Sequence, residues 1–167
     1  MIAFSDIPAL MLGPLEGKGD EAWFHTPPGK WSPGQVVDHV TTALENSAKA
    51  MRSRTDKPPM QRRPHTLRQR IFKFIVLGTG FFPPGRKAPE TALPAQRPDR
   101  AATERRLKES VAAFQELERT LLPARANDLF VKHPIFGDLT ISEWIHFHCR
   151  HAAHHAKQVR DRVPTAP

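Results

Sequence analysis

The chain has 167 residues, and its 25 Lys and Arg residues against 17 Asp and Glu residues give a formal net charge of +8. This length is typical of one domain, so we expect a single domain over residues 1–167 with its core at about residues 20–162. The single Cys excludes an internal disulfide and a zinc site made of cysteines alone.

The first thirty residues are rich in Pro and Gly, which leaves room only for short helical pieces at about Ser5 to Leu12 and Asp20 to Phe24. The first long helix is predicted to begin directly after Ser32. A Pro at the first helical position and Gln35 three residues after Ser32 are typical of a capping box. Small and apolar residues then recur at three- and four-residue steps, which predicts a helix from Pro33 to about Arg54.

A second, shorter helix is predicted over Leu67 to Leu77, ended by the glycines that follow it. Four apolar side chains share one face of this helix: Leu67, Ile71, Phe74 and Ile75. The segment from Phe81 to Asp99 contains five prolines and no periodicity. We predict that it is a long extended connection over the surface, with enough length to cross over the molecule.

Asp99 is predicted to cap a helix that runs to about Leu122, whose apolar residues recur as in the seam of a bundle. Thr140 begins another capping box, so the last helix is predicted from Ile141 to about Arg162. No segment alternates for long enough to predict a sheet, although Leu129 to Lys132 fits a short extended piece. We therefore predict an all-α fold, namely a four-helix bundle with one long crossover loop.

Five of the nine histidines fall within ten residues of the last predicted helix. His151 and His155 lie one turn apart on the face that apolar neighbours mark as buried, and two imidazoles at this spacing can hold one divalent ion. In the alternative interpretation the two rings are hydrogen-bonded or partly exposed, because such pairs are common. The residues expected around the metal, or in the lining of its pocket, are Trp144, His148, His154 and Gln158.

A third ligand must come from a facing helix, and His39 is the candidate because it lies on the apolar face of the helix capped by Ser32. Taken alone, His39 is more typical of a hydrogen-bonded core histidine. We interpret His25, His65 and His133, which fall in predicted loops, as surface or turn residues. A site of three histidines leaves open coordination positions, which is typical of a metal that binds water and lowers its pKa.

Together these residues resemble a known family, the DinB/YfiT-like superfamily of metal-binding four-helix bundles. Trp31-Ser32-Pro33 followed by His39 is similar to the W-S-x-x-x-x-x-x-H pattern that opens the second helix of its members. The last helix resembles their H-x-x-H-H-x-x-Q pattern, which reads here His151, His154, His155 and Gln158. Residues 127–140 also resemble the lead-in to the last helix in a subgroup of DinB-like metal-dependent hydrolases.

The resemblance implies a bundle with a long crossover between its second and third helices, and a metal site of His39, His151 and His155. We expect a divalent metal, Zn or Ni before Mn or Fe, and a small-molecule substrate or low-molecular-weight thiol as partner. The family contains thiol transferases, a thiol-dependent isomerase and members with no known activity, so we expect a metal-dependent hydrolase or thiol S-transferase. No catalytic residue is assigned beyond the metal ligands.

Several alternatives stay open at this point. In one alternative, the protein is a non-enzymatic, stress-associated bundle that the metal only stabilises. The oligomeric state is also open, because the family often forms dimers and a homodimer is therefore an alternative to a monomer. The two residues Ala156-Lys157 stand where many members have Arg-Gly, and Pro8, Gly13 and Pro14 break a first helix that is usually longer. These departures concern the mouth of the pocket and the packing of a dimer more than the metal ligands.

The positive charge is interleaved with Ala, Glu and Gln rather than with aromatic residues. We therefore expect no nucleic-acid partner and keep a basic nucleic-acid binder as the least favoured alternative. No apolar run approaches the ~20 residues needed to cross a bilayer, and Met1 to Leu12 lacks the basic leading segment of a signal peptide. We expect a cytoplasmic protein without a membrane partner. Cys149 is predicted to face away from His151, so a thiol bound at the metal must come from outside the chain.

Overall fold

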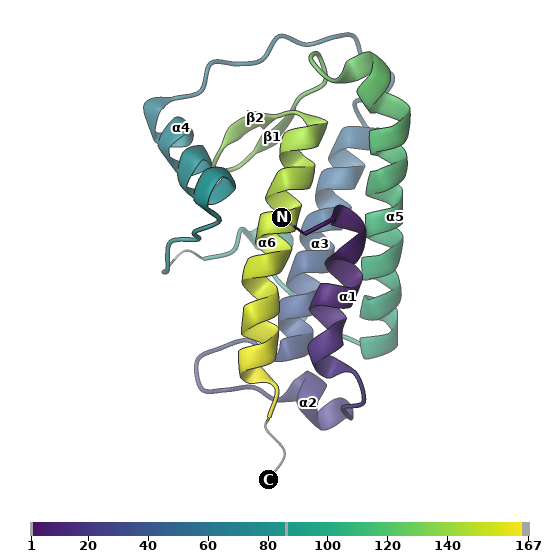
Figure 1. Cartoon of the computed structure of the whole chain (residues 1–167), viewed down its shortest axis with the longest axis vertical. Coiled ribbons are helices and arrows are strands. Elements are labelled where there is room, and N and C mark those ends of the chain that lie inside the picture. The colour runs from purple at the N-terminus through teal and green to yellow at the C-terminus, as the bar shows by residue number, and fades with distance from the viewer. Residues whose placement is uncertain (1, 86, 165–167) are drawn as a thin grey trace.

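A computed structural model describes residues 2–85 and 87–164 of the chain (Figure 1). This part of the protein is mostly helical, and its three long helices are α3 (Pro33–Arg52), α5 (Arg100–Arg125) and α6 (Ile141–Arg162). α3 packs against both α5 and α6, and the short α1 (Ile7–Leu12) packs against the same two helices. The predicted predominance of helices is confirmed. Within the described residues, no helix has the length and apolar character needed to span a membrane.

The long helices begin where their capping residues predict. The Ser32 hydroxyl accepts the Gln35 backbone N–H at 3.1 Å, and the Gln35 side chain accepts the Ser32 N–H at 2.9 Å. Thr140 forms the same reciprocal pair at the start of α6, and the Asp99 carboxylate accepts the backbone N–H of the third residue of α5 at 2.7 Å. Each cap supplies acceptors to N–H groups that have no partner within the helix.

The N-terminal segment contributes more to the core than its Pro and Gly content suggests. It consists of short pieces: η1 (Phe4–Asp6), α1, η2 (Gly13–Leu15) and α2 (Asp20–Phe24). Phe4, Ile7, Met11 and Leu15 are all buried in the main hydrophobic cluster. The hydrophobic core therefore includes side chains that precede residue 20, and these follow one another at helical spacing although Pro and Gly interrupt the regular helix.

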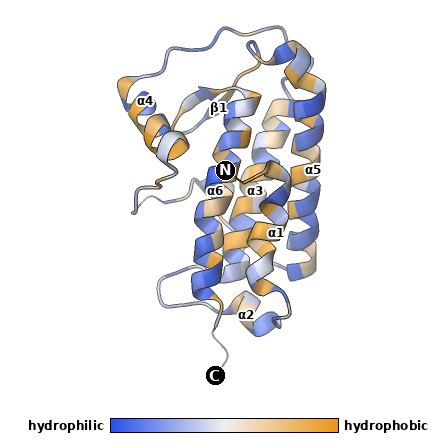
Figure 2. Cartoon of the chain, viewed as in Figure 1, coloured by the Kyte–Doolittle hydropathy of each residue, from blue (hydrophilic) through white to orange (hydrophobic). Residues whose placement is uncertain are grey.

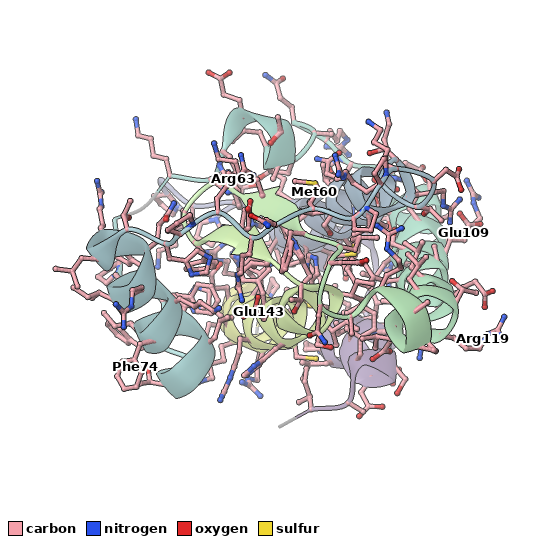
Figure 3. All side chains as sticks on the ribbon, turned by 90° about the horizontal axis from the view of Figure 1, so that it is seen from above. Met60, Arg63, Phe74, Glu109, Arg119 and Glu143 are labelled. Carbon is pink, nitrogen blue, oxygen red and sulfur yellow. The ribbon has the colours of Figure 1, made fainter. Side chains whose placement is uncertain are left out.

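The crossover between α3 and α5 contains α4 (Leu67–Lys73), which continues as the π-helical turn η3 (Phe74–Thr79) and ends at Gly80 with φ of +75°. α4 lies apart from the long helices (Figure 1) and carries hydrophobic residues although it packs little (Figure 2). Three of the four side chains predicted to share its apolar face are exposed, and Phe74 projects outward (Figure 3). The buried apolar residues of this segment are Val76 and Leu77, which lie in η3.

The segment from Phe81 to Asp99 is not the purely superficial connection that its prolines predict. It includes the turn η4 (Glu90–Ala92), and its residues 91–96 are hydrogen-bonded to α3. The Asp38 carboxylate accepts the Ala95 N–H at 2.8 Å, and the Asn46 side chain donates to a backbone carbonyl of η4 at 2.6 Å. These contacts come from polar side chains on α3, so apolar periodicity did not reveal them.

A two-stranded antiparallel sheet precedes α6 and was not predicted as a sheet. β1 (Val131–His133) pairs with β2 (Gly137–Leu139), with Val131 opposite Leu139 and His133 opposite Gly137. Gly137 has a φ of +77°, which glycine adopts without steric cost at the end of the tight turn. The hairpin packs against the start of α6 and brings His133 beside that helix.

Glu143, in the first turn of α6, connects this helix to the crossover. Arg62 donates to one of its carboxylate oxygens at 2.5 Å and Lys73 of α4 donates to the other. Burial alone would raise the pKa of Glu143, but these two cations and the Thr140 N–H outweigh it and lower the pKa to about 2. The charged form is therefore stabilised in the folded protein.

This lowered pKa predicts that Glu143→Gln removes a pH-dependent part of the stability. The contribution is complete above the unfolded pKa of about 4.3 and is lost as the pH falls towards 2, because the unfolded state binds the proton first. Urea unfolding from pH 6 to pH 2.5 should show the variant about 1–3 kcal/mol less stable near neutrality and close to the wild type in acid. Glu116→Gln, which breaks an exposed pair with Arg119, should change little. A Glu143→Gln deficit that does not vary with pH would contradict the assignment.

Candidate metal centre

Three histidines from two facing helices meet in the interior: His39 of α3, and His151 and His155 of α6. The Nε2 atom of His151 lies 3.2 Å from Nε2 of His39 and 3.0 Å from Nε2 of His155. Imidazole nitrogens this close must share a proton or a cation, and a tetrahedral ion with ~2.0–2.1 Å bonds accommodates such separations. These residues fit a three-histidine metal site.

The crossover orients the first of these rings. Nδ1 of His39 lies 2.6 Å from the carbonyl oxygen of Ala92 in η4, so Nδ1–H donates to that oxygen. This bond places the proton on Nδ1 and leaves the Nε2 lone pair pointing at the other two histidines. The ring also packs against Trp31, with centroids 5.1 Å apart. His39 is therefore held both by its own helix and by a backbone carbonyl more than fifty residues away.

Gln158 orients the ring of His155 in the same way. Nδ1–H of His155 donates to the Gln158 side-chain oxygen at 3.0 Å, which again leaves Nε2 unprotonated. The Gln158 amide nitrogen donates in turn to Nε2 of His154 at 3.1 Å. His154 stacks on Phe82, with ring centroids 4.7 Å apart. The side chains near the C-terminal end of α6 thus form a short chain of hydrogen bonds that fixes the orientation of the His155 ring.

His151 differs from its two neighbours, because its buried Nδ1 has no hydrogen-bond partner among the described residues. Its ring is held by packing, stacked on Phe147 at 5.1 Å. Burial lowers the pKa of all three rings, to about 3 for His155 and well below the ordinary value for His151, and the neighbouring histidines lower these two further. The rings are thus held in the neutral form that coordinates metal ions.

The triad forms part of the wall of a cavity of about 1340 Å³. This central cavity runs from the triad past Phe82 and Phe147 to Phe72 of α4 and to His133 and Phe136 of the hairpin. Its walls are largely apolar and aromatic, which is typical of a small-molecule site. The remaining coordination positions of an ion bound by the three Nε2 atoms would therefore face a space large enough for a small molecule.

The other residues expected near the metal lie in different positions. Trp144, His154 and Gln158 line the central cavity, and the Trp144 indole donates to the Val131 carbonyl at 3.1 Å. His148 does not line it: this ring is fully buried, and its Nε2 is hydrogen-bonded to Ser47 Oγ at 2.7 Å. Burial lowers the pKa of His148 to about 3, so it is a neutral ring in the helix packing.

His133 was interpreted as a surface or turn residue; it does adjoin the turn after β1, but it is not on the surface. Its side chain is only 6% exposed, and it lines the central cavity within a group of aromatic rings. The signal that indicates this position is the alternation of burial along β1, where Val131 and His133 are buried and Lys132 between them is exposed. Three residues are too few for such a pattern to be recognised in the sequence.

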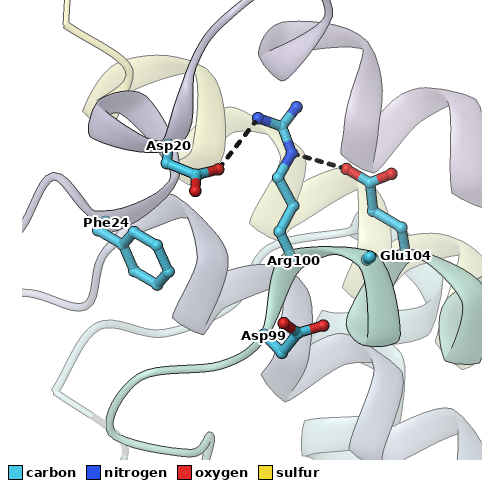
Figure 4. A pocket seen from close by; sticks show the side chains of 6 residues that line it. Asp20, Phe24, Asp99, Arg100 and Glu104 are labelled. Carbon is cyan, nitrogen blue, oxygen red and sulfur yellow. Dashed lines mark hydrogen bonds and ion pairs between the residues drawn. The ribbon is translucent and has the colours of Figure 1, made fainter.

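A second hollow, of about 390 Å³, lies between α2 and the start of α5 (Figure 4). Its arginine, Arg100, is bound by Glu104 at 2.9 Å and by Asp20 at 3.9 Å, and also donates to the carbonyls of Leu15 and Lys18. This arginine is used to tie the N-terminal segment to α5. We therefore interpret this hollow as a junction between the N-terminal segment and α5, and not as a binding site.

The model of the DinB superfamily matches residues 3–159. No curated protein and no solved structure matches the chain.

The hydrogen bond to His155 predicts the effect of changing Gln158. Gln158→Leu removes the acceptor for Nδ1–H, and loss of such a partner typically weakens metal binding by about 10- to 100-fold. Gln158→Glu retains an oxygen at this position and should bind more tightly than Gln158→Leu. Competition with a coloured zinc chelator measures both. Equal affinity in wild type and Gln158→Leu would show that this bond does not support the site.

Proposed function

Since the chain belongs to the DinB superfamily, we propose that it is a divalent-metal-dependent enzyme whose ion is bound by His39, His151 and His155. One observation carries this proposal: three neutral imidazoles converge through Nε2 on one point in the wall of a large apolar cavity. A structural metal site is typically closed by four protein ligands, whereas a catalytic site keeps a position for water or substrate. Among the described residues, only these three histidines form such a cluster.

The donor set favours Zn or Ni, because imidazole nitrogen suits these two metals, and Mn or Fe are the alternatives. Bound there, the ion would lower the pKa of a water or thiol and supply a nucleophile for hydrolysis or for thiol transfer. The chain's own part is to orient the ligands, through Ala92 and Gln158, and to exclude bulk water through the aromatic walls. Cys149 is buried, with a pKa raised by burial, which supports an external thiol.

The charges around the central cavity favour an anionic small molecule. The described residues that line it include four cations, Lys30, Lys87, Lys132 and Arg162, against one carboxylate, Glu90. Such an excess of one sign raises the local concentration of oppositely charged ligands. We therefore propose a substrate or thiol that carries a negative charge, bound by a monomer or a homodimer inside the cell.

The same proposal includes the architecture. α1 with its flanking turns completes a four-helix bundle with α3, α5 and α6, and the crossover that contains α4 and η4 joins its second and third helices. The triad then lies between the second and fourth helices of the bundle. This position is typical of metal sites built from side chains on facing helices.

Metal content tests the site directly. Protein purified without a histidine tag and incubated with Zn²⁺ or Ni²⁺ should retain close to one ion per chain after gel filtration, measured by elemental analysis. His155→Ala should lose it, because two imidazoles bind far more weakly than three. His146→Ala is the matched control, since His146 lies on the same helix but outside the cavity lining. A metal-free wild type, or equal loss in both variants, would contradict the proposal.

Thiol binding then separates an enzyme from a protein that the metal only stabilises. We expect low-molecular-weight anionic thiols to raise the melting temperature of the metal-loaded protein and to leave metal-free His155→Ala unchanged. The matched alcohols, which bind soft metal positions poorly, should have a smaller effect. If metal alone raises the melting temperature and no thiol or electrophile adds to it, the non-enzymatic alternative is favoured.

A further inference from the structure

His133 presents a hydrogen-bond donor whose orientation the turn after β1 fixes. Its Nδ1 accepts the backbone N–H groups of Ile135 at 3.1 Å and Phe136 at 3.4 Å. An imidazole nitrogen that accepts such bonds carries no proton, so the neutral ring has its proton on Nε2. Burial lowers the pKa of His133 to about 3, which keeps the ring neutral under ordinary conditions.

The Nε2–H group of His133 has no protein partner in the described part of the chain, although the residue is only 6% exposed. The Nε2 atom of His133 is nevertheless not completely sealed from solvent. Because the residue lines the central cavity, the accessible Nε2–H faces that space. A donor in an apolar wall costs free energy when no acceptor pairs with it, so a ligand that brings one is favoured.

His133 and the metal triad lie on either side of one aromatic ring. Phe147 meets the His133 ring edge-on with centroids 4.6 Å apart, and it stacks on His151 at 5.1 Å with an interplanar angle of 19°. All three residues line the central cavity. A molecule that reaches from the triad to His133 therefore has to extend across about the width of one ring, between aromatic walls.

We propose that His133 is a specificity-determining residue, and that the ligand is a flat, ring-containing molecule with a thiol at one end and an oxygen acceptor at the other. The thiol binds at the triad, and the carbonyl or carboxylate oxygen accepts the hydrogen bond from His133 Nε2–H. The aromatic walls contact the ring between them. This inference rests on the proposed metal site and adds the chemical class of the ligand.

Two aromatic thiols of similar outline test the inference. Para-acetylthiophenol carries a carbonyl oxygen opposite its thiol, and para-isopropylthiophenol has the same shape without the acceptor. Each is titrated into the Co²⁺-loaded protein, and thiolate binding is followed by the change in the cobalt absorption spectrum. For each protein we compare the affinity for the acetyl compound with that for the isopropyl compound. We expect this affinity ratio to be about 3- to 30-fold larger in the wild type than in a variant without the donor.

His133→Asn is the main variant, because its side-chain oxygen can still accept the Ile135 and Phe136 N–H groups while the residue is too short to reach the position of Nε2. The preference of the variant is compared with that of the wild type, so the different acidities of the two thiols cancel. His146→Asn, on α6 outside the cavity lining, should behave as the wild type does. His133→Phe provides a second variant that retains the aromatic packing.

Each outcome decides one of the two proposals. A preference that falls in His133→Asn or His133→Phe and not in His146→Asn supports the assignment. Equal preference in the wild type and both His133 variants, with clear thiolate spectra in all, overturns it and leaves the metal site intact. Failure of both thiols to bind the Co²⁺-loaded wild type overturns the ligand class. Absence of any bound Co²⁺ contradicts the metal site itself, and with it this inference.

Discussion

Three imidazole rings meet where Nε2 of His151 lies 3.2 Å from Nε2 of His39 and 3.0 Å from Nε2 of His155, and such rings remain buried at low cost only if they stay neutral or share a cation. Much of the chain serves this condition. The crossover supplies the Ala92 carbonyl to His39, and the end of α6 supplies Gln158 to His155. The facing positions of α3 and α6 follow from their shared core, so packing and site geometry depend on the same helix pair.

The central cavity combines two kinds of histidine. In the triad, His39 and His155 present unprotonated Nε2 atoms beside Nε2 of His151, whereas His133 presents a protonated Nε2 to the same cavity. The difference comes from what Nδ1 contacts: a carbonyl or amide oxygen makes it a donor, and backbone N–H groups make it an acceptor. One wall of the cavity therefore offers lone pairs, and another offers a hydrogen-bond donor, although all four side chains are neutral imidazoles.

Helical periodicity predicts the long helices and places His151 and His155 on one face, whereas the complete triad with His39 was implied by the family resemblance. Ser32, Asp99 and Thr140 mark helix starts through local chemistry, and His151 and His155 share a face by spacing alone. Ala92 and His133 were not predicted, since a backbone carbonyl in a proline-rich segment and a turn-fixed ring depend on contacts between distant parts of the chain. The exposure of the apolar face of α4 was not predictable either, because periodicity identifies an apolar face and does not say what covers it.

The Ala92 carbonyl couples the metal to a segment that lacks regular structure. Segments with few core contacts open at lower free energy than the helices they connect. Because His39 keeps its ligand orientation only while η4 is docked, an ion that favours this orientation also favours the docked crossover, by RT ln(1 + [M]/Kd) when only that form binds it. With the site empty, the proline-rich crossover would then be the segment most open to proteases, so cleavage would begin in the middle of the chain rather than at its ends.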